Sequence, residues 1–343
     1  MPASSAPPSW PAGRPKKNHD AAGPAAPLDN LNAEAPNRRA VIDIGTNSVK
    51  VLVADLAEGR LTPVSEMSRQ TRLGAGFYVT HKLQPPAIAL TAGAVAEFRA
   101  AAAKLGASSV RVIATSAARD ARNAVELIDA VRQSTGLETE ILSGDREAEW
   151  VFRGVTSNPR LAESPVLILD VGGGSTEFIV GDRAQPHIRS SYSLGTVRLL
   201  ELLRLSDPPG LAALAECRAW LKDFLVNQIV PFIEPALRAC REPVCLVGTG
   251  GTATILARIE TRMPGFDRDK IEAVQIPLPR IQAQLQEQWQ MTLAQRQQIV
   301  GMPPHRGDVI LTGMAIYEAI MAQFGLTSLG VSTRGLRYWA LLH

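Results

Sequence analysis

Two glycine-containing turns, far apart in this 343-residue sequence, have residues suited to holding an anion. The turn Gly172-Gly173-Gly174-Ser175 offers consecutive backbone N–H groups without obstructing side chains, and such groups bind phosphate oxygens. The turn Gly45-Thr46-Asn47-Ser48 is its counterpart, although either turn alone would favour a plain hairpin interpretation. Because each turn follows an Asp at the end of an apolar strand, we predict phosphate binding by both. The residues concerned are Asn47, Ser48, Gly172, Gly173, Gly174 and Ser175.

A third glycine cluster, Gly248-Thr249-Gly250-Gly251-Thr252, lies between an apolar strand and a helix. A helix that starts after such a loop presents N–H groups to an anion. With Ala253 the cluster also fits a degenerate dinucleotide fingerprint, but it comes late in the chain instead of in an opening strand–helix–strand unit. The sequence has no Gly-Lys pair and therefore no Walker A motif. We predict that Gly250, Gly251 and Thr252 contribute to phosphate binding.

Carboxylates flank the second turn and one carboxylate precedes the first. Asp170 and Glu177 lie on either side of the triple-glycine turn, and Asp43 is the symmetric residue of the first turn. Carboxylate oxygens beside phosphates are the ligands that Mg²⁺ prefers. A single Asp at a strand end is commonly a turn cap. Because the pattern occurs twice, we favour a site for Mg²⁺ or another divalent metal at Asp170, Glu177 and Asp43.

Glu147 and Arg119 are two further polar residues that follow predicted strands. Glu147 opens a predicted helix, where a lone Glu usually interacts with the helix dipole. Arg119 follows a buried strand and would ordinarily be a surface or ion-pairing residue. Basic side chains that could contact a polyanion are Arg69, Arg72, Arg198, Arg306 and Arg337. The five histidines are scattered and form no Ser-His-Asp or H-E-x-x-H pattern.

The elements that must position these residues form a repeat. Asp43-Ile44-Gly45 aligns with Asp170-Val171-Gly172, and Ser48 with Ser175. A further strand after each turn leads to a Leu-Gly step, at Leu73-Gly74 and Leu194-Gly195. A repeat of this length indicates duplication of half a molecule, since a solenoid needs three or more shorter units. Two similar halves facing each other would bring both turns to one cleft.

Strands and helices alternate along the rest of the chain, which indicates layered α/β structure. Pro231 and Pro235 should interrupt the long helical pattern that runs on to Cys240. We expect helices at 87–105, 123–135, 147–155, 197–203, 211–230, 252–259, 281–288, 293–299, 309–324 and 336–342, and further strands at 110–114, 138–142, 244–247 and 329–332.

Composition excludes several classes of protein. The formal net charge is +3, so composition alone gives no argument for specific nucleic-acid binding. No apolar run is long enough to span a membrane, and the N-terminus lacks a secretory signal. Three cysteines form no disulfide framework and indicate a reducing, cytoplasmic location. Residues 1–36 are rich in Pro and Ala, with a basic patch at Arg14, Lys16 and Lys17, and we predict a disordered tail.

Taken in order, the motifs resemble those of exopolyphosphatases and guanosine pentaphosphate phosphatases. The match covers roughly residues 38–343 and extends to Thr71-Arg72-Leu73-Gly74 and to the stretch 331–337. It rests on the following segments: Asp43-Ile44-Gly45-Thr46-Asn47-Ser48, Ala114-Thr115-Ser116-Ala117-Ala118-Arg119, Gly144-Asp145-Arg146-Glu147-Ala148, Asp170-Val171-Gly172-Gly173-Gly174-Ser175-Thr176-Glu177 and Gly248-Thr249-Gly250-Gly251-Thr252.

The resemblance implies a fold and an arrangement of domains. The fold is the duplicated actin-like, ribonuclease H-like α/β fold shared by acetate and sugar kinases, heat-shock chaperone ATPases and actin, with two lobes around a central cleft. After the tail at 1–36, we expect an N-terminal lobe at 37–150, onto which 333–343 packs back, and a C-terminal lobe at 151–332. Exposed helices of the second lobe would allow a homodimer, by analogy with the fold alone.

The resemblance also implies roles. Glu147 corresponds to the family's catalytic base, Arg119 to a phosphate-binding arginine, Asp170 and Glu177 to acidic residues tied to Mg²⁺, and residues 172–175 to the phosphate loop. The expected activity is release of terminal phosphate from inorganic polyphosphate, guanosine pentaphosphate or both. The stretch Ser332-Thr333-Arg334-Gly335 lacks an acidic residue often found there, and the sequence has no C-terminal His-Asp helical domain. It therefore resembles the short, two-domain members.

Two alternatives from other functional classes stay open at this point. An ATP-dependent kinase or ATPase of the same fold would use the same glycine loops, with residues 248–252 holding adenosine. A non-catalytic protein that binds polyphosphate or an alarmone would need the phosphate loops without turnover. The joint presence of Glu147, Asp170 and Glu177 favours an enzyme over such a binding protein.

Overall fold

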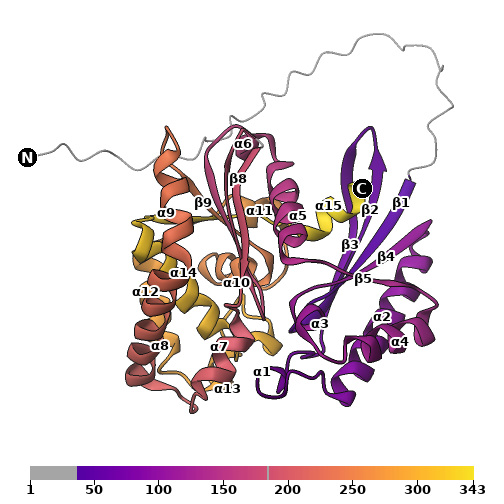
Figure 1. The fold of residues 1–343 in the computed structure, drawn as a ribbon, viewed down its shortest axis with the longest axis horizontal. Coiled ribbons are helices and arrows are strands. Elements are labelled where there is room, and N and C mark those ends of the chain that lie inside the picture. The colour runs from indigo at the N-terminus through magenta and orange to yellow at the C-terminus, as the bar shows by residue number, and fades with distance from the viewer. Residues whose placement is uncertain (1–36, 184) are drawn as a thin grey trace, which may run out of the picture.

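Two β-sheets, each flanked by helices, form the two halves of the molecule in this computed structural model (Figure 1). The structure describes residues 37–183 and 185–343, so the predicted tail at 1–36 and its basic patch lie outside the described residues. No helix within those ranges is long and apolar enough to cross a membrane.

The first sheet has the strand order β3-β2-β1-β4-β5. β1 pairs antiparallel with β2 and parallel with β4. Along β1 the side chains alternate between two faces: Ile42 packs in a core beneath α2 and α4, whereas Val41 packs in a core on the opposite side. The elements of this half are β1 (Asn37–Ile44), β2 (Ser48–Ala57), β3 (Arg60–Gln70), α1 (Phe77–Thr80), α2 (Pro85–Lys104), β4 (Ser109–Ala114), α3 (Ser116–Asp120), α4 (Ala124–Thr135) and β5 (Thr139–Ile141).

The second sheet repeats this order as β8-β7-β6-β9-β11 and adds β10 at its edge. Here too the first strand, β6, pairs antiparallel with the next strand and parallel with β9. The predicted duplication is therefore confirmed at the level of topology. The strands are β6 (Val166–Val171), β7 (Thr176–Asp182), β8 (Gln185–Tyr192), β9 (Cys245–Thr249), β10 (Gln275–Pro277) and β11 (Ser328–Val331).

The helices of the second half largely follow the predicted ranges, with two clear differences. The helix predicted at 293–299 ends at Arg296. The helix predicted at 211–230 leaves α-helical geometry at Leu225 and continues as a π-helical turn, because Pro231 has no N–H to maintain the α-helical pattern. The elements are α5 (Gly144–Thr156), α6 (Pro159–Ala162), α7 (Thr196–Leu203), α8 (Gly210–Phe224), η1 (Leu225–Ile229), α9 (Val230–Ala239), α10 (Gly250–Glu260), α11 (Arg268–Glu272), α12 (Leu278–Gln288), α13 (Leu293–Arg296), η2 (Pro304–Arg306), α14 (Ile310–Phe324) and α15 (Leu336–Leu342).

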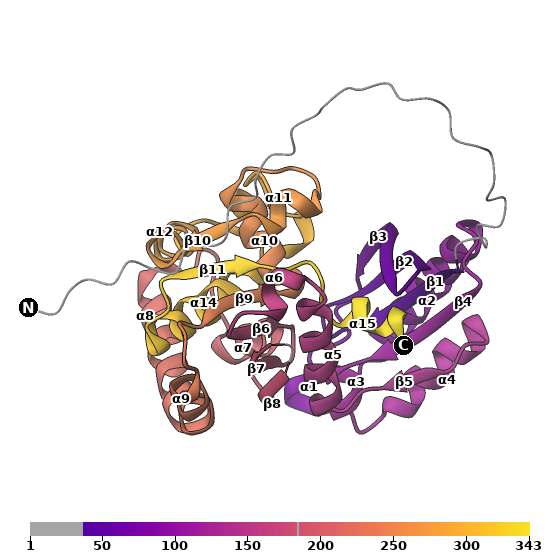
Figure 2. The same ribbon diagram turned by 90° about the horizontal axis from the view of Figure 1, so that it is seen from above.

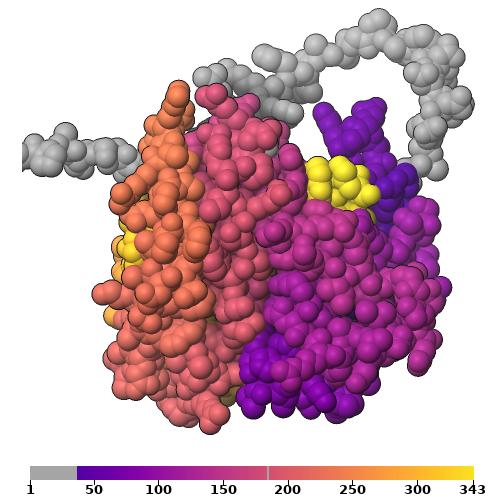
Figure 3. Space-filling view, in the orientation of Figure 1, coloured from indigo at the N-terminus to yellow at the C-terminus, as the bar shows by residue number. Residues whose placement is uncertain are grey.

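A third core lies between the two sheets. Helices α5 and α15 lie side by side there, as both ribbon views show (Figure 2). Buried residues of β1 and β4 meet residues of β6, β7 and β9 across these helices. The C-terminal helix α15 reaches the surface between the β2–β3 hairpin and α5 (Figure 3). This core joins the halves on one side of the molecule.

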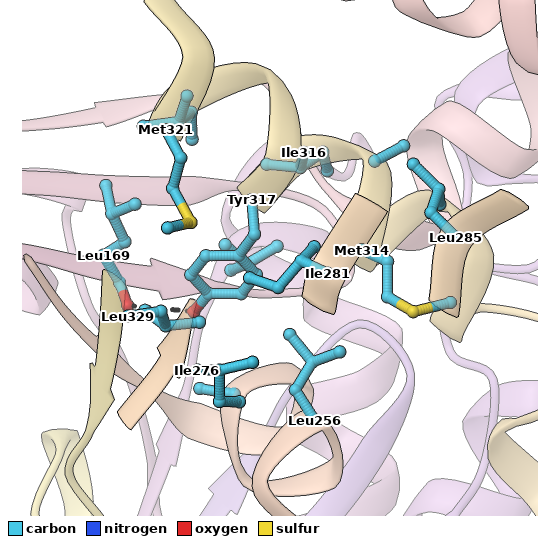
Figure 4. Close-up of a cluster of buried hydrophobic side chains, with 14 of the residues drawn as sticks. Leu169, Leu256, Ile276, Ile281, Leu285, Met314, Ile316, Tyr317, Met321 and Leu329 are labelled. Carbon is cyan, nitrogen blue, oxygen red and sulfur yellow. Dashed lines mark hydrogen bonds between the residues drawn. The ribbon is translucent and has the colours of Figure 1, made fainter. Parts of the chain in front are cut away.

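The core of the second half fixes the end of strand β6. Tyr317 of α14 is completely buried among side chains of α10, α12, β10 and β11, and its hydroxyl donates a hydrogen bond to the Leu169 carbonyl at 3.3 Å (Figure 4). Leu169 immediately precedes Asp170. The packing of Tyr317 therefore holds the strand end from which the Asp170 side chain projects.

Candidate active site

Both predicted glycine turns line one cavity of about 90 Å³ in the cleft. Each turn closes in the same way: the Gly45 N–H donates to the Ser48 carbonyl at 3.1 Å, and the Gly172 N–H donates to the Ser175 carbonyl at 3.0 Å. The cavity also receives Thr115, Ser116, Glu147, Asp170, Glu177, Gly251, Thr252 and Arg306, together with Asp43, Lys50 and Leu336. The structure therefore brings together predicted residues from both halves.

The two turns approach each other so closely that glycine is needed at the contact. A Cβ atom on Gly173 would lie 3.0 Å from the Cβ of Thr46 in the opposite turn. A side chain at this position would crowd Thr46, so the opposite turn would have to shift by a few tenths of an ångström. The glycine run thus serves close packing across the cleft as well as exposure of backbone N–H groups.

Glu147 enters the cavity from the first turn of α5. Ser143 caps this helix, and its Oγ accepts a hydrogen bond from the Arg146 N–H at 3.3 Å. The Glu147 Oε2 atom accepts from Arg119 Nη1 at 2.7 Å, and the same nitrogen lies 3.2 Å from the Leu142 carbonyl. Arg119 therefore joins the end of β5 to the start of α5 and fixes one oxygen of Glu147.

The carboxyl groups in the cavity hold their protons more tightly than ordinary ones. Burial, followed by the nearby Glu177 charge, raises the pKa of Glu147 well above its usual value, against the lowering effect of Arg119. Burial and Asp170 raise the pKa of Glu177 to about 7, although Ser191 and Ser175 donate hydrogen bonds to its Oε1 at 2.7 and 2.9 Å. Binding of a cation or a proton between the Glu147 and Glu177 carboxyl groups is therefore favoured.

Lys50 is a residue of this site that the sequence analysis missed. Asp170 pairs across the β6–β7 hairpin with Glu177, and Asp43 pairs in the same way with Lys50 in the β1–β2 hairpin. Burial, followed by Arg337, lowers the pKa of Lys50, while Asp43 and Asp170 oppose this shift. The sequence alignment of the two turns ended at Ser48 and Ser175. Extending this alignment by two residues would have matched Lys50 with Glu177 and so identified the lysine.

The acidic residues suit a metal that binds together with substrate. No group of three or more His, Cys, Asp or Glu side chains in residues 37–183 and 185–343 is arranged to hold a metal by itself. Among the described residues, none donates a hydrogen bond to the buried Oδ1 of Asp43. Burial raises the pKa values of both Asp43 and Asp170. Mg²⁺ characteristically uses one or two carboxylates plus phosphate oxygens, and this donor set fits that mode.

The remaining predicted phosphate-binding residues differ in their surroundings. Ser48 Oγ accepts a hydrogen bond from Arg306 at 2.8 Å, so this arginine reaches the first turn from the other half of the chain. The Thr252 hydroxyl donates to the Val171 carbonyl at 2.9 Å and thereby ties α10 to β6. Asn47 Oδ1 accepts from Gln70 at 3.2 Å. Gly250 and Gly251 open α10 beside Asp170, and Gly250 lines a second cavity.

This second cavity, of about 590 Å³, adjoins the first and shares Asp43, Lys50, Asp170 and Arg306 with it. Arg337 also lines it. The other candidate arginines lie elsewhere: Arg69 pairs with Glu97 at 2.9 Å, Arg72 with Asp308 at 2.7 Å, and Arg198 lies over the Tyr78 ring. The cleft thus consists of a small acidic chamber that opens into a larger one.

Comparisons with known proteins agree on one family. The sequence profile of the Ppx/GppA phosphatase family matches residues 52–341. Exopolyphosphatase 2 of Mycobacterium tuberculosis is 34% identical, over 87% of this chain and 95% of its own length. The guanosine-5'-triphosphate,3'-diphosphate pyrophosphatase of Aeromonas hydrophila is 26% identical over 87% of this chain and 57% of its own length.

Solved structures give the same result for the fold. The crystal structure of an exopolyphosphatase from Cytophaga hutchinsonii has a TM-score of 0.79 and 26% identity, covering 89% of this chain and 96% of that one. Together with the repeated strand order, this likeness confirms the predicted two-lobed actin-like fold.

Proposed function

Because the chain belongs to the Ppx/GppA phosphatase family, we propose that this hydrolase releases the terminal phosphate from inorganic polyphosphate, guanosine pentaphosphate or both. The names of its relatives support these two substrates. The observation that carries the proposal is the convergence of Glu147, Asp170 and the triple-glycine turn on one cavity. A cytoplasmic location and a homodimer stay predictions from the sequence.

In this proposal the terminal phosphate occupies the small cavity. Backbone N–H groups of residues 173–175, with Asn47 and Ser48 from the opposite turn, hold its oxygens, while the Gly172 N–H closes the turn. Arg306, which lines the cavity, and Arg119, which contacts Glu147, contribute positive charge. Preorganised donors of this kind are each worth roughly 3–4 kcal/mol of transition-state stabilisation.

Glu147 acts as the general base. Its free oxygen takes a proton from a water molecule while the water oxygen attacks the terminal phosphorus atom. The bond between that phosphorus and the bridging oxygen breaks, so orthophosphate is released and the bridging oxygen stays with the shortened substrate. Arg119 keeps the other Glu147 oxygen fixed. A positioned base contributes roughly 10²–10⁴-fold to the rate.

Asp170 and one neighbouring carboxylate, Glu177 or Asp43, would hold Mg²⁺ together with oxygens of the phosphate. When bound, the ion offsets charge on the phosphoryl oxygens and on the buried carboxylates. Thr252 positions Asp170 indirectly, because its hydrogen bond to the Val171 carbonyl fixes the adjacent residue of β6.

The test is a phosphate-release assay of Glu147→Gln with tripolyphosphate, long-chain polyphosphate and guanosine pentaphosphate in the presence of Mg²⁺. We expect less than about a tenth of wild-type turnover, with substrate affinity nearly unchanged, because Gln keeps the shape of Glu but cannot accept the proton.

Glu149→Gln is the matched control. Glu149 lies on the same helix but pairs with Arg153 and Arg189 instead of lining the cavity. We expect near wild-type turnover for this variant. Retention of more than about a tenth of the activity by Glu147→Gln would remove Glu147 from the role of base.

A further inference from the structure

Glu66 is an acidic residue in the wall of the larger cavity, which adjoins the small cavity. It projects from β3 and makes ion pairs with two arginines of the same wall. Arg268 of α11 contacts Glu66 Oε1, and Arg337 Nη1 of α15 lies 3.4 Å from Glu66 Oε2. The three side chains are between 17% and 21% exposed, so water screens these pairs only in part.

These ion pairs change the charge that the cavity offers to a substrate. Arg268 also contacts Thr333, and its Nη1 lies 3.9 Å from Glu272 Oε1. A further cavity residue, Arg258, donates to the carbonyls of Met263 and Pro264 at 3.4 and 2.7 Å. The arginines of the larger cavity are thus engaged by the protein itself. Lys50 and Arg306, which line both cavities, provide positive charge beside the small cavity.

We propose that Glu66 is a specificity-determining residue that restricts the enzyme to short phosphate chains. This inference rests on the proposed function, because it concerns where the remaining phosphates of the substrate lie when the terminal phosphate occupies the small cavity. The distal phosphates of a long chain enter the larger cavity, where Glu66 repels them and keeps Arg268 and Arg337 from binding them. A short chain ends before it meets this carboxylate.

Removing the charge of Glu66 should therefore improve only the binding of long chains. For Glu66→Gln we expect KM for long-chain polyphosphate to fall by about fivefold or more, because a repulsive charge is lost and Glu66 no longer neutralises Arg268 and Arg337. KM for tripolyphosphate should change by less than about twofold, and kcat for both substrates should be retained. Steady-state phosphate release at a fixed ionic strength measures all four constants.

The chain offers a closely matched control in Glu140→Gln. Glu140 also lies in the first sheet and also carries two arginines, Arg111 at 2.6 Å and Arg146 at 2.5 Å, but it lines neither cavity. The Glu140→Gln variant loses the same charge as Glu66→Gln, so its KM values for both substrates should equal those of the wild-type enzyme. Glu66→Asp retains the carboxylate and should keep the preference for short chains.

A binding measurement separates this inference from the proposed function. Fluorescence anisotropy of labelled long-chain polyphosphate, recorded with Glu66→Gln in a Glu147→Gln background, needs no turnover. Tighter binding than in Glu147→Gln alone supports the role of Glu66, whereas equal or weaker binding, or an equal gain for tripolyphosphate, overturns it. Absence of phosphate release by the wild-type enzyme from any substrate would sink the proposed function while leaving the anisotropy result interpretable.

Discussion

Lys50 and Glu177 occupy equivalent positions of two hairpins that otherwise match closely. Each stands across from an Asp at the end of the first strand of its sheet. In the second hairpin the result is a pair of carboxylates with raised pKa values, and in the first it is a carboxylate beside an ammonium group. The duplication has thus kept the backbone and changed the sign of one charge.

The raised pKa of Glu147 gives a prediction for the dependence of activity on pH. Glu147 must be deprotonated to accept a proton from water, so kcat/KM should rise with pH, with a limb displaced above the pKa of an ordinary Glu. Arg119 lowers the pKa of Glu147. We therefore expect Arg119→Gln to move this limb to higher pH, in addition to lowering the rate.

The measurement is a plot of log kcat/KM against pH for the two enzymes. Because Glu147, Glu177 and Asp170 interact, the limb reports the cluster and not one residue. An acidic limb at the pH of an unperturbed Glu, or a shift to lower pH in Arg119→Gln, would contradict the assignment of Glu147 as base.

At this scale the sequence revealed residues next to strand ends but not those brought in from a distance. Glu147, Arg119 and Asp170 each follow or end an apolar strand, and spacing is enough to notice them. Ser191 reaches Glu177 from β8 and was not predicted. Arg306 was one of five candidate arginines, and only its contact with Ser48, 258 positions away, distinguishes it from the others. Such contacts depend on how the halves dock, which no local pattern encodes.

At the level of elements, the start of α10 depends on one glycine. Gly250 has a φ of 78°, and a Cβ atom there would lie 2.2 Å from Asp170 Oδ1. For Gly250→Ala we expect a loss of unfolding free energy of at least about 1 kcal/mol from the backbone alone, and a large fall in kcat because Asp170 is displaced. Urea unfolding and phosphate release test the two effects separately.

Gly93→Ala in α2 serves as the comparison for that experiment. Apart from the neighbouring backbone of its own helix, no atom of the described residues would lie within 4 Å of a Cβ at Gly93, and its φ is not in the left-handed region. This variant should gain roughly 1 kcal/mol of stability from helix propensity and keep its activity. A Gly250→Ala enzyme that is as stable and active as Gly93→Ala would show that the α10 start tolerates a side chain.

The elements that sequence patterns predicted are the long, periodic ones. Helices α2, α4 and α14 lie within one or two residues of the expected ranges. Short elements such as β10 and α11, of three and five residues, were not predicted. β10 has one buried residue, Ile276, between exposed or half-buried neighbours, and only its pairing with β11 makes it a strand.

For the whole molecule, helix α15 joins the two halves through the central core. Leu341 is 2% exposed and packs in the same cluster as residues of both sheets. We expect Leu341→Ala to lower the free energy of unfolding by about 2–5 kcal/mol, since a buried cavity would form at the junction. Leu202→Ala, at a side chain that is 53% exposed, should change it by less than about 0.5 kcal/mol.

Denaturant unfolding of both variants gives these values. An equally small change in unfolding free energy for the two variants would mean that α15 contributes little to the junction.

The position of α15 could not be derived from the order of residues alone, because this last helix packs against the first two strands of the chain. Membership of the family implied that return, whereas periodicity indicated only a short helix.

The reversal of charge between Lys50 and Glu177 has a further consequence for a substrate whose ends are identical. The two ends of a linear polyphosphate are chemically identical. A cleft whose charges were related by a twofold axis would therefore bind the chain equally well in two opposite directions. Because Lys50 lies on one side of the cleft and Glu177 on the other, the two binding directions differ in energy. Under the proposed function, this difference in charge at one position of the repeat gives the cleft a preferred direction for the bound phosphate chain.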